Sequence, residues 1–191
     1  MEKYRGIKFK CELKRRNISR AYAKRISALI SISRNLKKLM KAKKNEGNIS
    51  AGAYGGFLIK TAGSSLTALR KNDFAFVERV DEKNFVVHAR GMKEPSSEAY
   101  MHHLIYRKRK DAKFIVHFHH EKLLVDAKKL GIPTTRREQP YGTKELAREA
   151  VNALGKGKKL IALKNHGLVL ISKNKYDAVK RLASLLHKQC R

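Results

Sequence analysis

The chain has 191 residues, of which 42% are hydrophobic and 32% are charged, and its formal net charge is +29 at pH 7. This length and apolar content fit one globular domain and exclude a chain that is disordered throughout. The longest apolar runs are too short to cross a bilayer and no apolar stretch follows Met1, so we expect no membrane span, no signal peptide and a cytoplasmic location.

The first part of the chain is predicted to contain strands and one long helix. Apolar and charged residues alternate over residues 7–13, which predicts a half-buried strand. From residue 18 to 41 the apolar spacing becomes that of an amphipathic helix. Residues 45–50 are polar and contain glycine, which indicates a turn, and residues 52–56 are typical of a hairpin turn before a short strand at 57–59.

The middle of the chain continues this alternation of elements. Residues 74–79 and 84–88 are predicted to pair as strands across a short polar turn. The Pro-Ser-Ser-Glu sequence at 95–98 is a typical helix start, and the helix should run to about Arg109. Residues 113–119 are apolar enough to predict another strand.

The last part of the chain adds helices that end at glycine. Helices are predicted at 121–130 and 143–154, strands on either side of 165–167, and a closing helix at 176–188. The chain contains no internal repeat and no linker between domains. Interspersed strands and helices, with some strands paired locally, predict a layered α/β domain with a mixed sheet.

Three histidines stand out as candidate metal ligands. His117 and His119 lie two residues apart in an apolar strand, so their side chains share one face, while Phe118 and His120 point to the other. Neutral imidazoles need hydrogen-bond partners and are poor core residues, and this spacing suits two corners of a zinc tetrahedron. His166, in a tight turn between two apolar strands, is a candidate third ligand. Spacing alone leaves open the alternative that these are surface or partnered histidines.

A carboxylate and two hydroxyls mark the start of the helix after residue 95. Glu98 there is typical of simple compensation of the helix dipole, and it could form an ordinary pair with His102, four residues on. However, Ser96 and Ser97 add hydroxyls and backbone N–H groups at the positive end of the helix, which is an arrangement that holds phosphate. We therefore expect a phosphate site beside an acid. The histidines interpreted as structural are His88, His102, His103, His120 and His187.

The excess of positive charge allows a different class of function, nucleic-acid binding. The basic residues are spread along the whole chain and interleaved with acids such as Glu138, Glu145 and Glu149. No zinc-finger spacing, glycine-rich clamp or aromatic platform accompanies them. We interpret the charge as a solvated surface that favours phosphorylated substrates and binds nucleic acid incidentally at low salt.

Six short motifs occur in an order that carries a family resemblance. They are Gly47-Asn48-Ile49-Ser50, Ile59-Lys60-Thr61-Ala62-Gly63, Pro95-Ser96-Ser97-Glu98, His117-Phe118-His119, Tyr141-Gly142-Thr143-Lys144-Glu145-Leu146 and Asn165-His166-Gly167-Leu168. Over about residues 20–190 this set resembles the class II aldolase/adducin family, and within it most closely the L-fuculose-1-phosphate aldolases. Residues 1–17, with their predicted strand, are an addition to the family pattern.

The resemblance implies a fold and a site. The fold is a single domain over residues 1–191, with three α/β/α layers around a mixed, mainly antiparallel sheet, assembled as a homotetramer. One zinc ion per chain is held by Glu98, His117, His119 and His166, and Glu98 is also the catalytic acid and base. The substrate phosphate is held by Gly47, Asn48, Ala62, Gly63, Ser96 and Ser97.

The implied activity is that of a zinc-dependent lyase that reversibly splits a ketose 1-phosphate, similar to L-fuculose 1-phosphate, into dihydroxyacetone phosphate and an aldehyde. The alternatives are a pentulose-phosphate 4-epimerase or dehydratase that uses the same metal site, and a non-catalytic adducin-like binding domain. The chain departs from the family at Ala62, where the family has threonine and where Thr61 or Ser64 are candidate replacements. Residues 133–141 are shorter than in the fuculose enzyme and have no counterpart of its proton-donating tyrosine.

Overall fold

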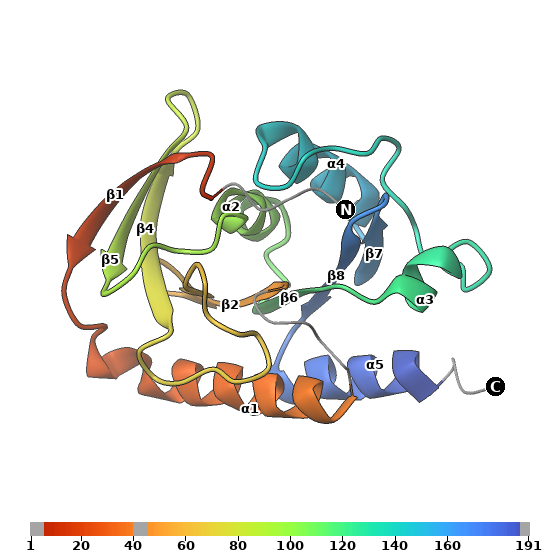
Figure 1. The fold of residues 1–191 in the computed structure, drawn as a ribbon, viewed down its shortest axis with the longest axis horizontal. Coiled ribbons are helices and arrows are strands. Elements are labelled where there is room, and N and C mark those ends of the chain that lie inside the picture. The colour runs from red at the N-terminus through yellow and green to blue at the C-terminus, as the bar shows by residue number, and fades with distance from the viewer. Residues whose placement is uncertain (1–5, 40–45, 188–191) are drawn as a thin grey trace.

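A single open sheet organises the chain, in a computed structural model that describes residues 6–39 and 46–187. In this part of the chain eight strands lie in the order β1-β5-β4-β3-β2-β6-β8-β7 (Figure 1). β1 is parallel to β5, and all other neighbouring strands are antiparallel. The strands are β1 (Lys10–Arg15), β2 (Asn48–Ala53), β3 (Gly56–Lys60), β4 (Phe74–Asp81), β5 (Val86–Gly91), β6 (Phe114–Phe118), β7 (Leu160–Leu163) and β8 (Gly167–Ser172).

Helices cover both faces of this sheet. α1 and α5 pack side by side on one face, and α2 and α4 pack together on the other (Figure 1). The described helices are the 3-10 helix η1 (Arg20–Tyr22) and the α-helices α1 (Ala23–Leu39), α2 (Ala99–Lys108), α3 (Glu121–Val125), α4 (Lys144–Leu154) and α5 (Lys175–His187). None of them is long and apolar enough to pass through a bilayer. The predicted three-layer fold with a mixed, mainly antiparallel sheet is confirmed.

Apolar cores on both faces of the sheet hold the layers together. Leu29 and Leu36 of α1 and Leu182 of α5 are fully buried against one face of the sheet. Ile105 of α2 and Leu154 of α4 are fully buried against the other face. Burying such side chains contributes roughly 1.5–3 kcal/mol each. Because both faces are covered, β8 is buried along its whole length.

Turn and cap residues fix the ends of several elements. Thr143 caps α4 by accepting a hydrogen bond from the Leu146 amide, and Gly155 ends the helix with φ +48°. The predicted hairpin is present as β2 and β3, joined by a turn at Tyr54 and Gly55. These local signals give the positions of α4 and the hairpin directly from the sequence.

Some predicted boundaries were wrong for physical reasons. The first strand pairs with β5 from Lys10 onward, so it lies three residues later than the alternation predicted. Residues 48–50 were expected in a turn but form the start of β2, because β3 and β6 pair with them on either side. The helix predicted at 121–130 is only the short α3, in which Leu123 alone is buried, followed by turns. Lys41 and Lys188, at predicted helix ends, lie outside the described residues.

Candidate metal and phosphate site

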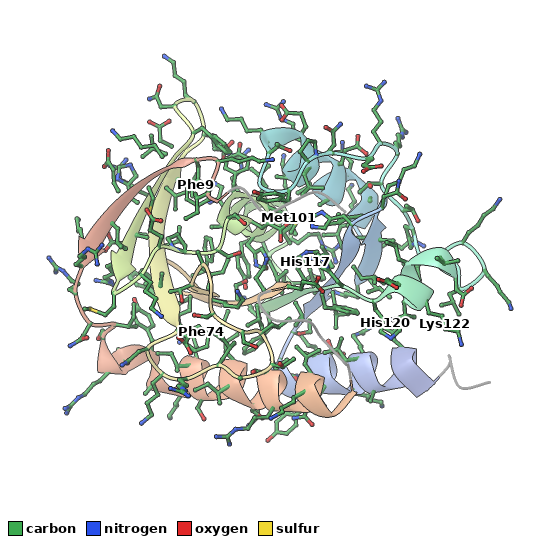
Figure 2. All side chains as sticks on the ribbon, viewed as in Figure 1. Phe9, Phe74, Met101, His117, His120 and Lys122 are labelled. Carbon is green, nitrogen blue, oxygen red and sulfur yellow. The ribbon has the colours of Figure 1, made fainter. Side chains whose placement is uncertain are left out.

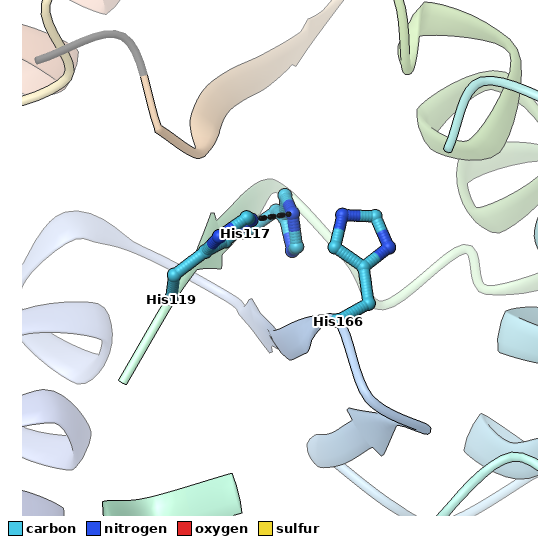
Figure 3. A group of neighbouring side chains, drawn as sticks. All are labelled: His117, His119 and His166. Carbon is cyan, nitrogen blue, oxygen red and sulfur yellow. Dashed lines mark hydrogen bonds between the residues drawn. The ribbon is translucent and has the colours of Figure 1, made fainter. Parts of the chain in front are cut away.

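Three histidines meet where the central strands end. His117 lies in β6, His119 follows that strand, and His166 lies in the turn that leads into β8. Because β6 is antiparallel to β8, with His117 opposite Val169, the turn before β8 returns to the end of β6. Figure 3 shows the three rings facing one another, and Figure 2 shows His117 near the middle of the molecule.

The spacing of the three rings fits one metal ion. Their candidate ligand nitrogens all lie within 4.8 Å of one another, and the Nε2 atoms of His117 and His119 are 3.1 Å apart. The ring centroid of His166 lies 4.9 Å from that of His117 and 5.1 Å from that of His119. Nitrogens bound to zinc at about 2.0–2.1 Å in a tetrahedron are separated by about 3.4 Å. Small side-chain rotations therefore bring all three rings into ligand positions.

His117 is held in the form that a metal requires. Its Nδ1 lies 3.0 Å from the carbonyl oxygen of Leu168, to which it donates a hydrogen bond, so Nε2 keeps its lone pair. Burial lowers the pKa of His117 well below 6.5, and the neighbouring His166 and His119 lower it further. The ring is thus neutral at physiological pH, which removes proton competition with a cation.

Two glycines make room for this cluster. A Cβ atom on Gly167 would stand 2.9 Å from both His117 Cε1 and His119 Cδ2, so any side chain there would push the rings aside. Gly47 has φ +72°, and a Cβ on it would stand 2.5 Å from the His117 carbonyl oxygen. Residue 47 must therefore be glycine for β2 to pass this close to β6.

Glu98 places a carboxylate against the imidazoles. It is the N-cap residue of α2 and is 5% exposed. Its Oε2 accepts a hydrogen bond of 2.7 Å from Asn48 Nδ2 and lies 3.2 Å from His117 Nε2. Its Oε1 lies 3.6 Å from His166 Nε2 and accepts no hydrogen bond from the described residues. Glu98 thus presents two oxygens to the cluster: Oε2 is fixed by its hydrogen bond from Asn48, and Oε1 has no hydrogen-bond donor among the described residues. This arrangement suits a fourth metal ligand or a general base.

Four of the six expected phosphate residues, Ala62, Gly63, Ser96 and Ser97, lie in two joined turns. Ala62 N donates to the Glu94 carbonyl, and Ser96 N donates to the Lys60 carbonyl, so the turn with Ala62 and Gly63 lies against Ser96. Ser97 is also close to Gly142, where a Cβ would stand 3.0 Å from the Ser97 carbonyl oxygen. The remaining two residues, Gly47 and Asn48, lie beside His117 and Glu98.

The hydroxyl missing at Ala62 is not supplied by its neighbours. Thr61 Oγ1 and Ser64 Oγ are 2.7 Å apart, and Ser64 also donates to Asp73. Both hydroxyls therefore stabilise the turn itself, and the amide of Ala62 is already bonded to Glu94. Ala62 contributes shape rather than a hydrogen-bond donor.

Lys60 is a site residue to which the sequence reasoning gave no role. It ends β3, is 2% exposed, and its Nζ donates to the Thr61 carbonyl at 3.3 Å. Burial lowers its pKa to about 8, although Glu98 and Asp73 act in the opposite direction. A lysine that directly continues the apolar run from Phe57 to Ile59 was the available signal, since a buried lysine needs a reason.

The histidines interpreted as structural fall into two groups. His103 pairs with Glu82, His88 pairs with Glu12, and His120 caps α3 by accepting from the Leu123 amide. His102 is different, because it is fully buried and its pKa is lowered by burial to about 3. It does not form the expected side-chain pair with Glu98, and its Nδ1 lies 2.6 Å from Ser50 Oγ. The side chain of His187 lies outside the described part of the chain.

The fold and this site together define an α/β domain with a candidate metal site of three histidines. Residues 27–191 match the family described as Class II Aldolase and Adducin N-terminal domain, and the chain belongs to this family. The family takes in the class II aldolases, which are metal-dependent carbon–carbon lyases, and relatives that resemble this chain carry aldolase names.

Individual relatives support this assignment. The chain is 29% identical over 170 residues to the 5-methylthioribulose-1-phosphate/5-deoxyribulose-1-phosphate aldolase of Rhodospirillum rubrum. This match covers 80% of this chain and 72% of that protein. It is 34% identical over 128 residues to fluorothreonine transaldolase of Streptantibioticus cattleyicolor, covering 65% of this chain but only 19% of that protein.

Solved structures show the same fold. An L-fuculose 1-phosphate aldolase matches with a TM-score of 0.71 and 24% identity, over 91% of this chain and 87% of that one. A sugar-phosphate aldolase from Thermotoga maritima matches with a TM-score of 0.72 and 21% identity, over 90% of this chain and 95% of that one.

Proposed function

We propose that the protein is a zinc-dependent aldolase that reversibly cleaves a ketose 1-phosphate into dihydroxyacetone phosphate and an aldehyde. The observation that carries the proposal is the meeting of His117, His119 and His166, distant in sequence, beside the buried carboxylate of Glu98. The buried Lys60, which interacts electrostatically with Glu98, and the start of α2 both bring positive potential to this region, which suits a phosphorylated substrate.

The donor set supports zinc as the metal, with one ion per chain. Three imidazoles and a carboxylate favour zinc over magnesium or calcium, which prefer oxygen ligands. A bound zinc ion supplies a Lewis acid that stabilises negative charge developing on substrate oxygens. Burial and the neighbouring His166 and His119 lower the pKa of His117 and keep it neutral, and its hydrogen bond to Leu168 leaves Nε2 to bind without losing a proton.

Lys60 and the start of α2 are proposed to hold the phosphate. Ser96 and Ser97 contribute hydroxyls at the positive end of a ten-residue helix, and Gly63 turns the chain beside them. The buried ammonium of Lys60 adds a charge that water screens poorly. We assign Lys60 to the position that the family threonine at residue 62 would otherwise serve.

Glu98 is proposed to handle the proton of the reaction. Cleavage breaks the C3–C4 bond, the C4 hydroxyl loses its proton as the aldehyde forms, and the bonding electrons stay with the C1–C3 fragment. That fragment becomes dihydroxyacetone phosphate when C3 takes up a proton. Asn48 holds Oε2 of Glu98, which leaves Oε1 to hold the proton and deliver it to C3.

The aldehyde half of the substrate is proposed from the relative in Rhodospirillum rubrum. That enzyme's substrates are 5-deoxyribulose and 5-methylthioribulose 1-phosphates, whose C4–C5 fragment ends in a methyl or methylthio group. The short segment at 133–141, with no counterpart of the fuculose enzyme's tyrosine, suits such a small aldehyde. Glu138 in this segment accepts a 2.6 Å hydrogen bond from Asn165, the residue before His166, and so steadies the turn that carries that ligand.

The test is cleavage of a panel of phosphorylated ketoses by zinc-loaded protein. L-Fuculose, 5-deoxyribulose and 5-methylthioribulose 1-phosphates are incubated with it, and dihydroxyacetone phosphate is measured by coupled reduction with NADH. We expect release from at least one of them, and release at least about 100-fold slower after Glu98→Gln. If no substrate yields dihydroxyacetone phosphate, the aldolase proposal is wrong. NMR spectra of the protein incubated with the same substrates and with ribulose 5-phosphate would then show whether it catalyses epimerisation or dehydration instead.

Assembly and location stay predictions. The family resemblance implies a homotetramer with sites near subunit boundaries, which analytical ultracentrifugation of the purified protein tests directly. A cytoplasmic location is also expected, as is nucleic-acid binding that collapses at moderate salt because surface charges are screened.

A further inference from the structure

Three side chains of α2 meet three successive positions of β2 along a line that leads away from the metal site. Glu98 bonds to Asn48 at 2.7 Å, and His102 Nδ1 lies 2.6 Å from Ser50 Oγ. Tyr106 lies over Gly52, where a Cβ would stand 3.3 Å from Tyr106 Cε1, and its hydroxyl lies 2.8 Å from Ser50 Oγ. We call Ser50, His102 and Tyr106 the α2–β2 ladder.

The ladder arises from matching repeats in the two elements. Its members on α2, together with Glu98, are four residues apart, and Asn48, Ser50 and Gly52 on β2 are two residues apart. Four helical residues rise about 6 Å and two strand residues rise about 6.6 Å. The two series therefore stay in step over three pairs, and each pair fixes the helix against the strand at another point.

We propose that Ser50, His102 and Tyr106 are positioning residues that lock α2 against β2, so that Asn48 holds Glu98 in its reactive orientation. This rests on the proposed function, in which Glu98 moves the proton. None of the three residues has to touch the substrate or the metal.

The chemistry of the ladder favours positioning over simple packing. His102 is fully buried and Ser50 is fully buried, and both are polar, whereas an apolar pair of the same shape would fill the space without needing hydrogen bonds. A hydrogen bond is directional and defines a distance within a few tenths of an ångström, which apolar contact does not. The carboxylate of Glu98 needs that precision, since an error near 1 Å in a catalytic group costs orders of magnitude in rate.

The ladder also explains why β2 has a glycine at residue 52 and why α2 has a tyrosine at residue 106. Gly52 leaves room for the ring of Tyr106, and the ring brings its hydroxyl to Ser50. Ser50 thereby serves His102 and Tyr106 at once. Removing the Ser50 hydroxyl takes away the β2 partner of His102 Nδ1 and one of the two β2 partners of the Tyr106 hydroxyl, the other being the Gly52 backbone.

The test compares Ser50→Ala and His102→Leu with a matched deletion on the other face of the sheet. Ser33→Ala is the control, because Ser33 is also a buried serine, on α1, and it accepts a 3.4 Å hydrogen bond from the Leu69 amide. His102→Asn is the conservative variant, since its amide group can replace Nδ1 in the bond to Ser50. The readouts are kcat and KM for ketose-phosphate cleavage, unfolding temperature, and the visible spectrum of the cobalt-substituted protein.

We expect Ser50→Ala and His102→Leu to lower kcat by about 10- to 100-fold, with KM within a factor of about two, as for other residues that orient a metal-site group. His102→Asn should recover most of kcat, and Ser33→Ala should lose stability without losing kcat. The cobalt spectrum, which reports the geometry of the Glu98 ligand without turnover, should change in Ser50→Ala and stay unchanged in Ser33→Ala.

The outcomes separate the two proposals. If the wild type cleaves no ketose phosphate while the cobalt spectrum still changes only in the ladder variants, the aldolase proposal fails and the positioning role stands. If kcat and the spectrum are unchanged, or if the losses in Ser50→Ala and Ser33→Ala simply follow their unfolding temperatures, the ladder is ordinary packing and the inference is overturned.

Discussion

Replacing Lys60 with methionine is expected to stabilise the folded chain while weakening its hold on a phosphorylated substrate. Lys60 is 2% exposed, and burial lowers its pKa from 10.5 to about 8 even though Glu98 and Asp73 favour its charged form. One pKa unit corresponds to about 1.4 kcal/mol, so holding the ammonium in this place costs roughly 3 kcal/mol below pH 8. Methionine is an unbranched side chain that can fill the same space without the charge.

The sign of the pH dependence follows from the lowered pKa. Below pH 8 Lys60 is protonated in both the folded and unfolded chains, and the whole cost is present. Between pH 8 and 10.5 the folded chain has lost this proton while the unfolded chain keeps it, so the stability of the wild type rises with pH. The advantage of Lys60→Met should therefore be complete at pH 7 and should disappear near pH 10.5.

Urea unfolding of metal-free protein at pH 7 and at pH 10 measures this advantage, with Lys24→Met as a control because Lys24 is exposed on α1. In the cleavage assay, Lys60→Met should raise KM for the phosphorylated substrate by at least about tenfold, since a buried charged hydrogen bond contributes roughly 1.5–3 kcal/mol. If Lys60→Met is no more stable than the wild type at pH 7, the argument that burial of the charged Lys60 destabilises the folded chain is refuted. An unchanged KM would refute its role at the phosphate.

Three further predictions concern the metal site and its carboxylate. His117→Ala should lose most of the bound zinc measured by mass spectrometry, while His120→Ala, which changes the next histidine on the other face of the strand, should keep it and lose only the α3 cap. Glu98→Gln should retain the fold and lower kcat by at least about 100-fold, because an amide cannot carry the proton; a smaller loss would mean that another group moves it. Gly167→Ala should weaken zinc binding because its Cβ would crowd the rings of His117 and His119. Gly157→Ala is the control, since a Cβ there meets nothing within 4 Å, and it should leave the zinc dissociation constant unchanged. A competition titration with a chromophoric chelator measures this constant for both variants.

The histidine cluster could be predicted from the sequence because most of its geometry is local. The alternation of side chains along a strand puts His117 and His119 on one face without any knowledge of the fold, and a histidine in a tight turn between apolar strands is an obvious third candidate. The short segments around Ser96 and Ser97 likewise carry their own helix-start signal. The family resemblance then supplied the order in which these pieces meet.

Lys60 and the ladder could not be predicted in the same way because they depend on which elements face each other. The spacing of Glu98, His102 and Tyr106 shows that they share one face of a helix, but it does not show that β2 lies under that face. His102 was therefore interpreted as an ordinary helix-face residue, although it is fully buried against Ser50. Lys60 received no role from the sequence because its burial depends on how residues 61 and 62 pair with residues 94 and 95, far along the chain.

The net charge of +29 and the charge of Lys60 act on a phosphate in different ways. At physiological salt, exposed charges are screened over about 8 Å, so the surface lysines and arginines raise the rate at which anions arrive without selecting among them. Many of them are also paired, as Arg107 is with Glu82 and Lys159 with Asp111. Lys60 lies inside the protein, where screening is weak and its position relative to Glu98 is fixed. If Lys60 holds the phosphate as proposed, selectivity for a phosphorylated ketose over a larger polyanion comes from this buried charge, and a surface this basic is then compatible with a small-molecule enzyme.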